Sequence, residues 1–137
     1  MKKTAFILLI IMTTFLTAYA MQIQGGTKEF VDILQADPDQ ITEISLTAPL
    51  ESNYNSTTDD TKIQAFIAIL HQHGYKKIQG EPAYLPMKAV MIYLYENDNF
   101  HYIVLFENKL LINETYYEIT NGEITNKFLT EYYHSLE

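Results

Sequence analysis

The chain contains no cysteine and no arginine among its 137 residues. Without cysteine it has no disulfide, no thiolate nucleophile and no attachment point for the lipid of a bacterial lipoprotein. Nine lysines face seventeen acids, which gives a formal net charge of −8. Nucleic acids and anionic membrane surfaces are bound through basic patches, so the sequence predicts neither as a partner.

Catalytic motifs are also missing. The serines Ser45, Ser52, Ser56 and Ser135 lack the flanking glycines of a nucleophile elbow. No glycine run could cradle a phosphate, and no acidic segment has the glycine and terminal glutamate of a calcium loop. The sequence therefore assigns no catalytic residue and favours a protein that is not an enzyme.

The four histidines do not form a metal site by their spacing. His71 and His73 lie two residues apart on a predicted helix and point about 200° away from each other. His101 lies in an apolar strand, and His134 lies opposite the apolar stripe of the last helix. We therefore predict no metal and no other cofactor.

Residues 1–20 are typical of a secretory signal peptide. Lys2 and Lys3 precede an apolar run from Ala5 to Leu16, and Ala18-Tyr19-Ala20 supplies the small residues that signal peptidase reads. We expect a secreted or cell-envelope bacterial protein that starts at Met21, with no stable membrane association after cleavage. An uncleaved membrane anchor is the alternative, because no charge occurs from Thr4 to Thr27.

The 117 residues from Met21 onward fit one domain. Residues 21–40 form an N-terminal segment in which Thr27 to Gln35 can make a short helix, and residues 41–137 form a single α+β domain. Ile41 to Thr47 alternates as a strand, and Glu51 to Thr58 is a polar loop.

The clearest predicted helix runs from Asp59 to His73. Thr57 and Asp60 have capping-box spacing at its start, and Gly74 is placed to end it in a left-handed conformation. Its apolar residues recur at helical spacing: Ile63, Phe66, Ile67 and Leu70.

Beyond Tyr75 the apolar period changes to two. Lys76 to Gly80 can form a short strand, and the last helix runs from Thr125 to Leu136. The strands between them are Ala89 to Glu96, Phe100 to Glu107, Lys109 to Asn113 and Thr115 to Thr120. The predicted fold class is α+β: an antiparallel β-meander of about five strands, with one central amphipathic helix packed on a face and a C-terminal helix.

The register of the hairpin around Asn97-Asp98-Asn99 decides which side chains share a face. An even-numbered turn joins Val90, Ile92 and Leu94 with His101, Ile103 and Leu105. The other face then carries Met91, Tyr93, Tyr95, Tyr102, Val104 and Phe106. An odd-numbered turn mixes the two sets, because a slip of one residue turns every side chain over. We favour the even turn.

Eleven tyrosines and seven phenylalanines are many for this length, and tyrosine is enriched at interfaces. The candidate ligand-binding residues on an aromatic sheet face are Tyr93, Tyr95, Tyr102, Tyr116 and Tyr117. The alternative is that these rings are core residues beneath the first helix or the N-terminal segment.

Several segments resemble small uncharacterised extracytoplasmic α+β domains of Gram-positive bacteria. They are Ile41-Thr42-Glu43-Ile44, Asp60-Thr61-Lys62-Ile63, Tyr93-Leu94-Tyr95, Tyr102-Ile103-Val104 and Tyr116-Tyr117-Glu118-Ile119. The resemblance implies a compact α+β domain and no established activity. We expect an exported, non-enzymatic binding or interaction module for a protein, peptide or glycan outside the cytoplasm. The alternatives are an inhibitor or immunity-type protein acting on a basic partner, and a small envelope hydrolase using a carboxylate and His101.

Overall fold

The structure is a computed structural model that describes residues 26–80 and 85–137, so the predicted leader lies outside the described residues. None of the described helices is long and apolar enough to cross a membrane. In chain order the elements are β1 (Thr27–Lys28), α2 (Phe30–Leu34), a short 3-10 turn η1 (Pro38–Gln40), β2 (Glu43–Leu46), β3 (Asn55–Thr57), α3 (Asp60–His71), β4 (Gly74–Lys77), β5 (Val90–Glu96), β6 (Asn99–Phe106), β7 (Lys109–Ile112), β8 (Thr115–Thr120) and α4 (Asn126–His134).

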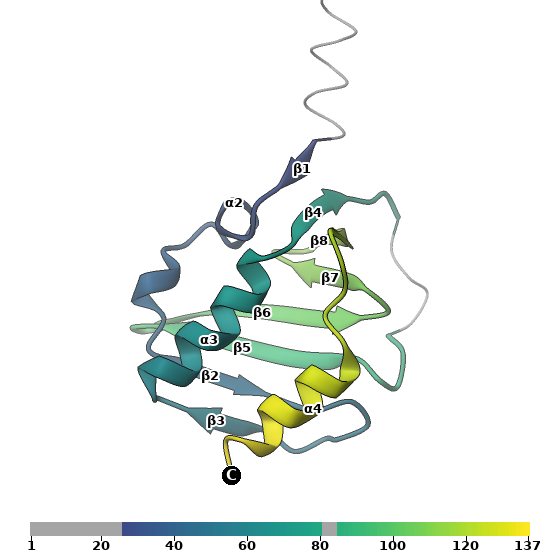
Figure 1. The fold of residues 1–137 in the computed structure, drawn as a ribbon. Helices are drawn as coiled ribbons and strands as arrows, with labels where there is room; N and C mark the ends of the chain where they lie inside the picture. The colour runs from purple at the N-terminus through teal and green to yellow at the C-terminus, as the bar shows by residue number, and fades with distance from the viewer. Residues whose placement is uncertain (1–25, 81–84) are drawn as a thin grey trace, which may run out of the picture.

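The strands form one antiparallel sheet in the order β1-β4-β8-β7-β6-β5-β2-β3 (Figure 1). The α+β class and the antiparallel sheet were predicted correctly, but the expected number of about five strands is wrong, because the sheet has eight. β1 and β3 are the two edge strands, and the sequence pattern missed both. Strands of two and three residues are too short to show alternation.

The β5–β6 hairpin has the even register. Asn97 and Asp98 form a two-residue turn, Glu96 lies opposite Asn99, and Tyr93 lies opposite Tyr102. The predicted separation of aliphatic and aromatic residues is therefore confirmed. The sheet has one face for the helices, called the helix face below, and an opposite one, called the far face.

All three α-helices contribute to the core on the helix face, with α3 and α4 lying across the sheet in Figure 1. Tyr75 of β4 is fully buried there, and its hydroxyl donates a hydrogen bond to the Leu70 carbonyl of α3 at 2.6 Å. The largest other buried side chains of this core are Phe30, Phe66, Ile33, Leu34, Ile44, Leu46, Ile63, Leu70, Ile92, Leu94 and Ile103.

The start of α3 differs from the prediction. Asp59 is the N-cap residue, and its carboxylate accepts hydrogen bonds from the backbone N–H groups of Thr61 and Lys62 at 2.9 and 3.3 Å. Thr57 belongs to β3 instead, where its hydroxyl accepts from the Asp59 N–H. The capping box between Thr57 and Asp60 was therefore wrong, because strand pairing with β2 takes Thr57 away from the helix.

Gly74 also has a different role from the predicted left-handed helix end. The helix ends at His71 with Gln72 as C-cap, and Gly74 is the first residue of β4. A Cβ atom at this position would collide with the side chains of Thr27 and Thr120 on the neighbouring strands. The glycine is needed for the close approach of three strands, not for a positive φ.

Two further boundaries differ from expectation, and the final helix agrees with it. The helix expected over Thr27 to Gln35 is shorter, because Thr27 and Lys28 pair with β4 and α2 begins at Phe30. The strand expected over Lys76 to Gly80 begins earlier and ends at Lys77. The final helix lies within its predicted range.

Candidate functional site

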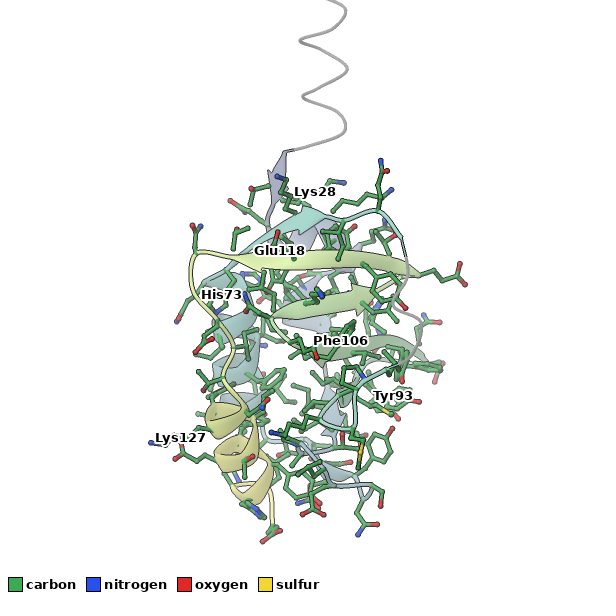
Figure 2. All side chains as sticks on the ribbon, turned by 90° about the vertical axis from the view of Figure 1, so that its right-hand side faces the viewer. Lys28, His73, Tyr93, Phe106, Glu118 and Lys127 are labelled. Atoms are coloured by element: carbon green, nitrogen blue, oxygen red, sulfur yellow. The ribbon has the colours of Figure 1, made fainter. Side chains whose placement is uncertain are left out.

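The candidate site is on the far face, where the described helices do not pack. Figure 2 shows Tyr93 on the opposite side of the sheet from α4, which carries Lys127. The strand register explains this placement, because Tyr93 and Tyr102 alternate with the core residues Ile92 and Ile103. These tyrosines are therefore not core residues beneath a helix.

Five rings on this face form a contiguous group, called the aromatic cluster below: Tyr54, Tyr93, Tyr95, Phe100 and Tyr102. Tyr93 is at its centre. Its ring centroid lies 5.0 Å from that of Tyr102, 5.4 Å from Phe100, 5.7 Å from Tyr54 and 6.2 Å from Tyr95. These separations are in the range of favourable aromatic pairs. The rings stabilise one another and hold a defined surface.

Strand pairing brings four of the five rings together. Tyr93 and Tyr102 are direct cross-strand partners, and so are Tyr95 and Phe100. Tyr54 comes from the segment between β2 and β3, and its hydroxyl is 3.5 Å from the Met91 sulfur of β5. Tyr54 therefore folds over the sheet and completes the cluster.

The cluster is open to solvent at its border. Phe100 is 57% exposed and Tyr54 is 42% exposed, while Tyr93, Tyr95 and Tyr102 are half-buried. An exposed phenylalanine at the border of a ring cluster is informative, since exposed aromatic patches mark interaction sites. The cluster offers apolar ring surface together with phenolic hydroxyl groups.

Two tyrosine hydroxyls of the cluster, those of Tyr54 and Tyr102, have raised pKa values. Burial raises the pKa of Tyr54 above its usual value of 10, and neighbouring tyrosines, Tyr93 first, raise this pKa further. Burial and then Tyr93 raise the pKa of Tyr102 in the same way. These two hydroxyl groups are therefore protonated at neutral pH and can donate hydrogen bonds.

The other two predicted site residues lie outside the cluster. Tyr116 is half-buried on the far face, with its ring 6.2 Å from Phe106, and packs against a smaller apolar group of Ala89, Val104 and Phe106, which Tyr102 of the cluster also packs against. Tyr117 points to the helix face and is buried in the main core. Adjacent residues of a strand point to opposite faces, so only one of the two could belong to an aromatic face.

Sequence reasoning missed Tyr54 and Phe100 as site residues. Phe100 had a usable signal, because it alternates with Tyr102, Val104 and Phe106 along β6. Tyr54 had none, since it lies in an irregular segment whose position depends on tertiary contacts.

His101 lies on the helix face near the β5–β6 turn. Its Nε2 atom is 3.3 Å from Oε2 of Glu96, and its side chain is 16% exposed. This is a single histidine-carboxylate pair. In residues 26–80 and 85–137, no group of three or more histidine, aspartate and glutamate side chains could hold a metal ion.

A cavity of about 550 Å³ lies at one end of the sheet, between residues 86–88, the β6–β7 turn and the start of α4. Leu105, Phe106 and Leu129 form part of its apolar wall. Lys88, Lys109, Glu107 and Glu123 are its charged lining residues. Neither His101 nor any ring of the aromatic cluster lines this cavity, so it is separate from both.

The fold and the site define a small α+β protein whose eight-stranded antiparallel sheet has helices on one face and an aromatic cluster on the other. Comparison of the chain with protein-family models, with curated proteins and with solved structures found no match. The resemblance to Gram-positive extracytoplasmic domains therefore stays a prediction.

Proposed function

We propose that this protein is an exported, non-enzymatic binding module that contacts a protein or peptide partner through the aromatic cluster. The observation that carries the proposal is the combination of five packed rings with an exposed border at Phe100 and Tyr54. Packed rings lose little side-chain freedom on binding and bury a large area, so tyrosine clusters suit interfaces.

A protein or peptide partner suits the shape of this surface. The cluster lies on a sheet face and is separate from the cavity, so it offers area instead of enclosure. Small ligands are bound in concave sites that bury most of their surface, whereas protein interfaces are broader.

The hydrolase alternative has weaker support from the geometry. General acid and base catalysis in a glycosidase-like site needs two carboxyl groups across a substrate cleft. His101 contacts one carboxylate, that of Glu96, and does not line the cavity. We therefore prefer binding over catalysis.

Site-specific crosslinking tests the proposal. A photoreactive phenylalanine analogue at Phe100 is expected to crosslink a partner from the native envelope or culture fluid. The matched control is the same analogue at Val31, an exposed apolar residue of α2. A Tyr54→Ala substitution in the Phe100 crosslinking protein is expected to reduce the yield, because it removes a neighbouring ring from the same surface.

The result that contradicts the proposal is an equal crosslinking yield at Phe100 and Val31, or no crosslinked species at Phe100. Circular dichroism of each variant shows whether a lost crosslink reflects a lost fold.

A further inference from the structure

The charges around the aromatic cluster have one sign. β5 and β6, which carry four of the rings, and β2 and β3, which follow them toward one edge of the sheet, lie within residues 41–59 and 89–106, which contain five acids and no lysine. β7, on the other side of β6, carries Lys109, which pairs with Phe106 at the end of β6 away from Phe100. The seven lysines between Lys28 and Lys127 all lie outside these two segments. This half of the sheet therefore has a negative potential with no internal compensation.

Three of the five acids belong to strands or segments that carry the rings or pair with them. Glu43 is the cross-strand partner of Tyr95 and shares its face of the sheet. Asp98 is in the turn that leads into β6, two residues before Phe100. Glu51 is in the segment that carries Tyr54. Both Asp98 and Glu51 are exposed.

We propose that the aromatic cluster binds a cationic segment of a protein or peptide, with lysine or arginine side chains over the rings of Phe100 and Tyr54. This inference rests on the proposed function and names the chemistry of the partner. The face of an aromatic ring attracts a cation, and arginine is the more frequent partner. The surrounding acids attract the same segment from a distance and speed its association.

Charge also decides between a foreign partner and a second copy of this chain. Two copies that met through this face would bring their lysine-free halves together, and like charges at an interface are costly. A cationic partner removes that repulsion. The chemistry of the face thus favours association with a different molecule.

A nuclear magnetic resonance titration of the purified protein tests the inference. The probes are hexaarginine and hexalysine, with hexaglutamate, a Gly-Ser hexapeptide and chitohexaose as comparisons. We expect the ring resonances of the aromatic cluster to shift with hexaarginine, and less with hexalysine. The affinity is expected to fall as salt is raised, because screening weakens the attraction of exposed charges.

Matched variants separate ring chemistry from general attraction to an acidic protein. Phe100→Leu keeps an apolar side chain but removes the ring, and we expect it to weaken hexaarginine binding about two- to fivefold, as Phe100→Ala does. Asp98→Asn is expected to weaken binding more than Glu123→Gln, which removes the same charge from the end of the molecule that lies near Lys88 and Lys109.

The outcomes distinguish the two proposals. If Phe100→Leu binds like the parent protein, or if Glu123→Gln weakens binding as much as Asp98→Asn, the cationic inference is overturned. Binding of the Gly-Ser peptide at the cluster without the cationic peptides would overturn it but retain the proposed protein-binding function. Binding of chitohexaose alone would replace both with a glycan site.

Discussion

At the scale of single residues, the β7–β8 turn holds Glu114 in a backbone conformation that glycine would adopt more easily. Asn113 and Glu114 both have positive φ, 48° and 61°, in a two-residue hairpin turn. This geometry is typical of a type I′ turn, for which Asn-Gly is the favoured pair. Asn113 suits its position, and its side-chain amide also donates to the Ile33 and Leu34 carbonyls at the end of α2. Glu114 does not suit its position.

We therefore expect Glu114→Gly to stabilise the protein. Relief of the left-handed strain outweighs the greater freedom of glycine in the unfolded chain, with a net gain of about 0.5–1 kcal/mol. Thermal unfolding by circular dichroism measures it. Glu114→Gln is the control, because it removes the same charge and keeps the strain. Equal melting temperatures for the two variants would attribute the gain to charge and contradict the argument.

The aromatic cluster shows which site residues could be predicted from the sequence alone. Tyr93, Tyr95 and Tyr102 follow from strand periodicity once the hairpin register is known. The same periodicity excludes Tyr117 from this face, because Tyr117 neighbours Tyr116 in β8 and must point to the opposite face. Its prediction as a site residue was therefore wrong. Tyr54 required the tertiary structure, because no local pattern places an irregular segment over β5.

At the scale of elements, α3 and α4 are joined by a partly buried hydrogen bond. The Tyr132 hydroxyl donates to the Lys62 carbonyl at 2.9 Å, and its ring packs 4.8 Å from that of Phe66. Burial, and then the charge of Asp59, raise the pKa of Tyr132 to about 12. The folded state therefore favours the protonated phenol.

This shift predicts a loss of stability at alkaline pH. The stabilising contribution of the protonated Tyr132 is present below pH 10 and is lost as pH rises from 10 to about 12, because the unfolded phenol ionises first. Urea unfolding across this range measures the fall. Tyr132→Phe is expected to reduce the slope and to cost about 1 kcal/mol at pH 7, where it leaves the Lys62 carbonyl without this donor.

Tyr75 contributes to the same alkaline loss, because burial raises its pKa as well. Tyr132→Phe should therefore flatten the profile in part, and Tyr75→Phe combined with Tyr132→Phe should flatten it further. An unchanged slope in the double variant would show that other groups control alkaline unfolding.

The elements themselves were predictable to the extent that they have their own periodicity. The helix at α3 and the β5–β6 hairpin have long apolar patterns and were predicted with the correct faces. β1 and β3 have no such pattern. They are strands because Thr27 and Lys28 pair with β4, and residues 55–57 pair with β2.

At the scale of the whole molecule, the N-terminal strand and the aromatic cluster lie in different halves of the sheet. β1 is at one edge and β3 at the other (Figure 1), and β5 and β6, which carry four rings of the aromatic cluster, lie nearer to the β3 edge. Four and five strand spacings of about 4.8 Å separate β1 from β6 and β5, which is roughly 19–24 Å. The proposed partner would therefore bind far from the N-terminal end of the domain.

The same asymmetry in charge makes a prediction about salt. In residues 26–80 and 85–137, Lys127 and Glu131, at 3.8 Å, form the one lysine-carboxylate pair within 4 Å, and both are exposed. Repulsion among the acids is therefore weakly compensated. Since salt screens this repulsion, the melting temperature should rise between about 10 mM and 0.5 M sodium chloride.

Neutralisation of a single acid locates the repulsion within the molecule. Asp98→Asn, in the lysine-free half, should raise the melting temperature at low salt and reduce the salt response. Glu123→Gln should change both less, because Lys88 and Lys109 line the same cavity as Glu123. The expected difference is a few tenths of a kcal/mol, since exposed charges contribute about that much. A melting temperature that falls with salt would mean that attractive pairs dominate, and the lysine-free half would then not be under the electrostatic stress that a cationic partner relieves.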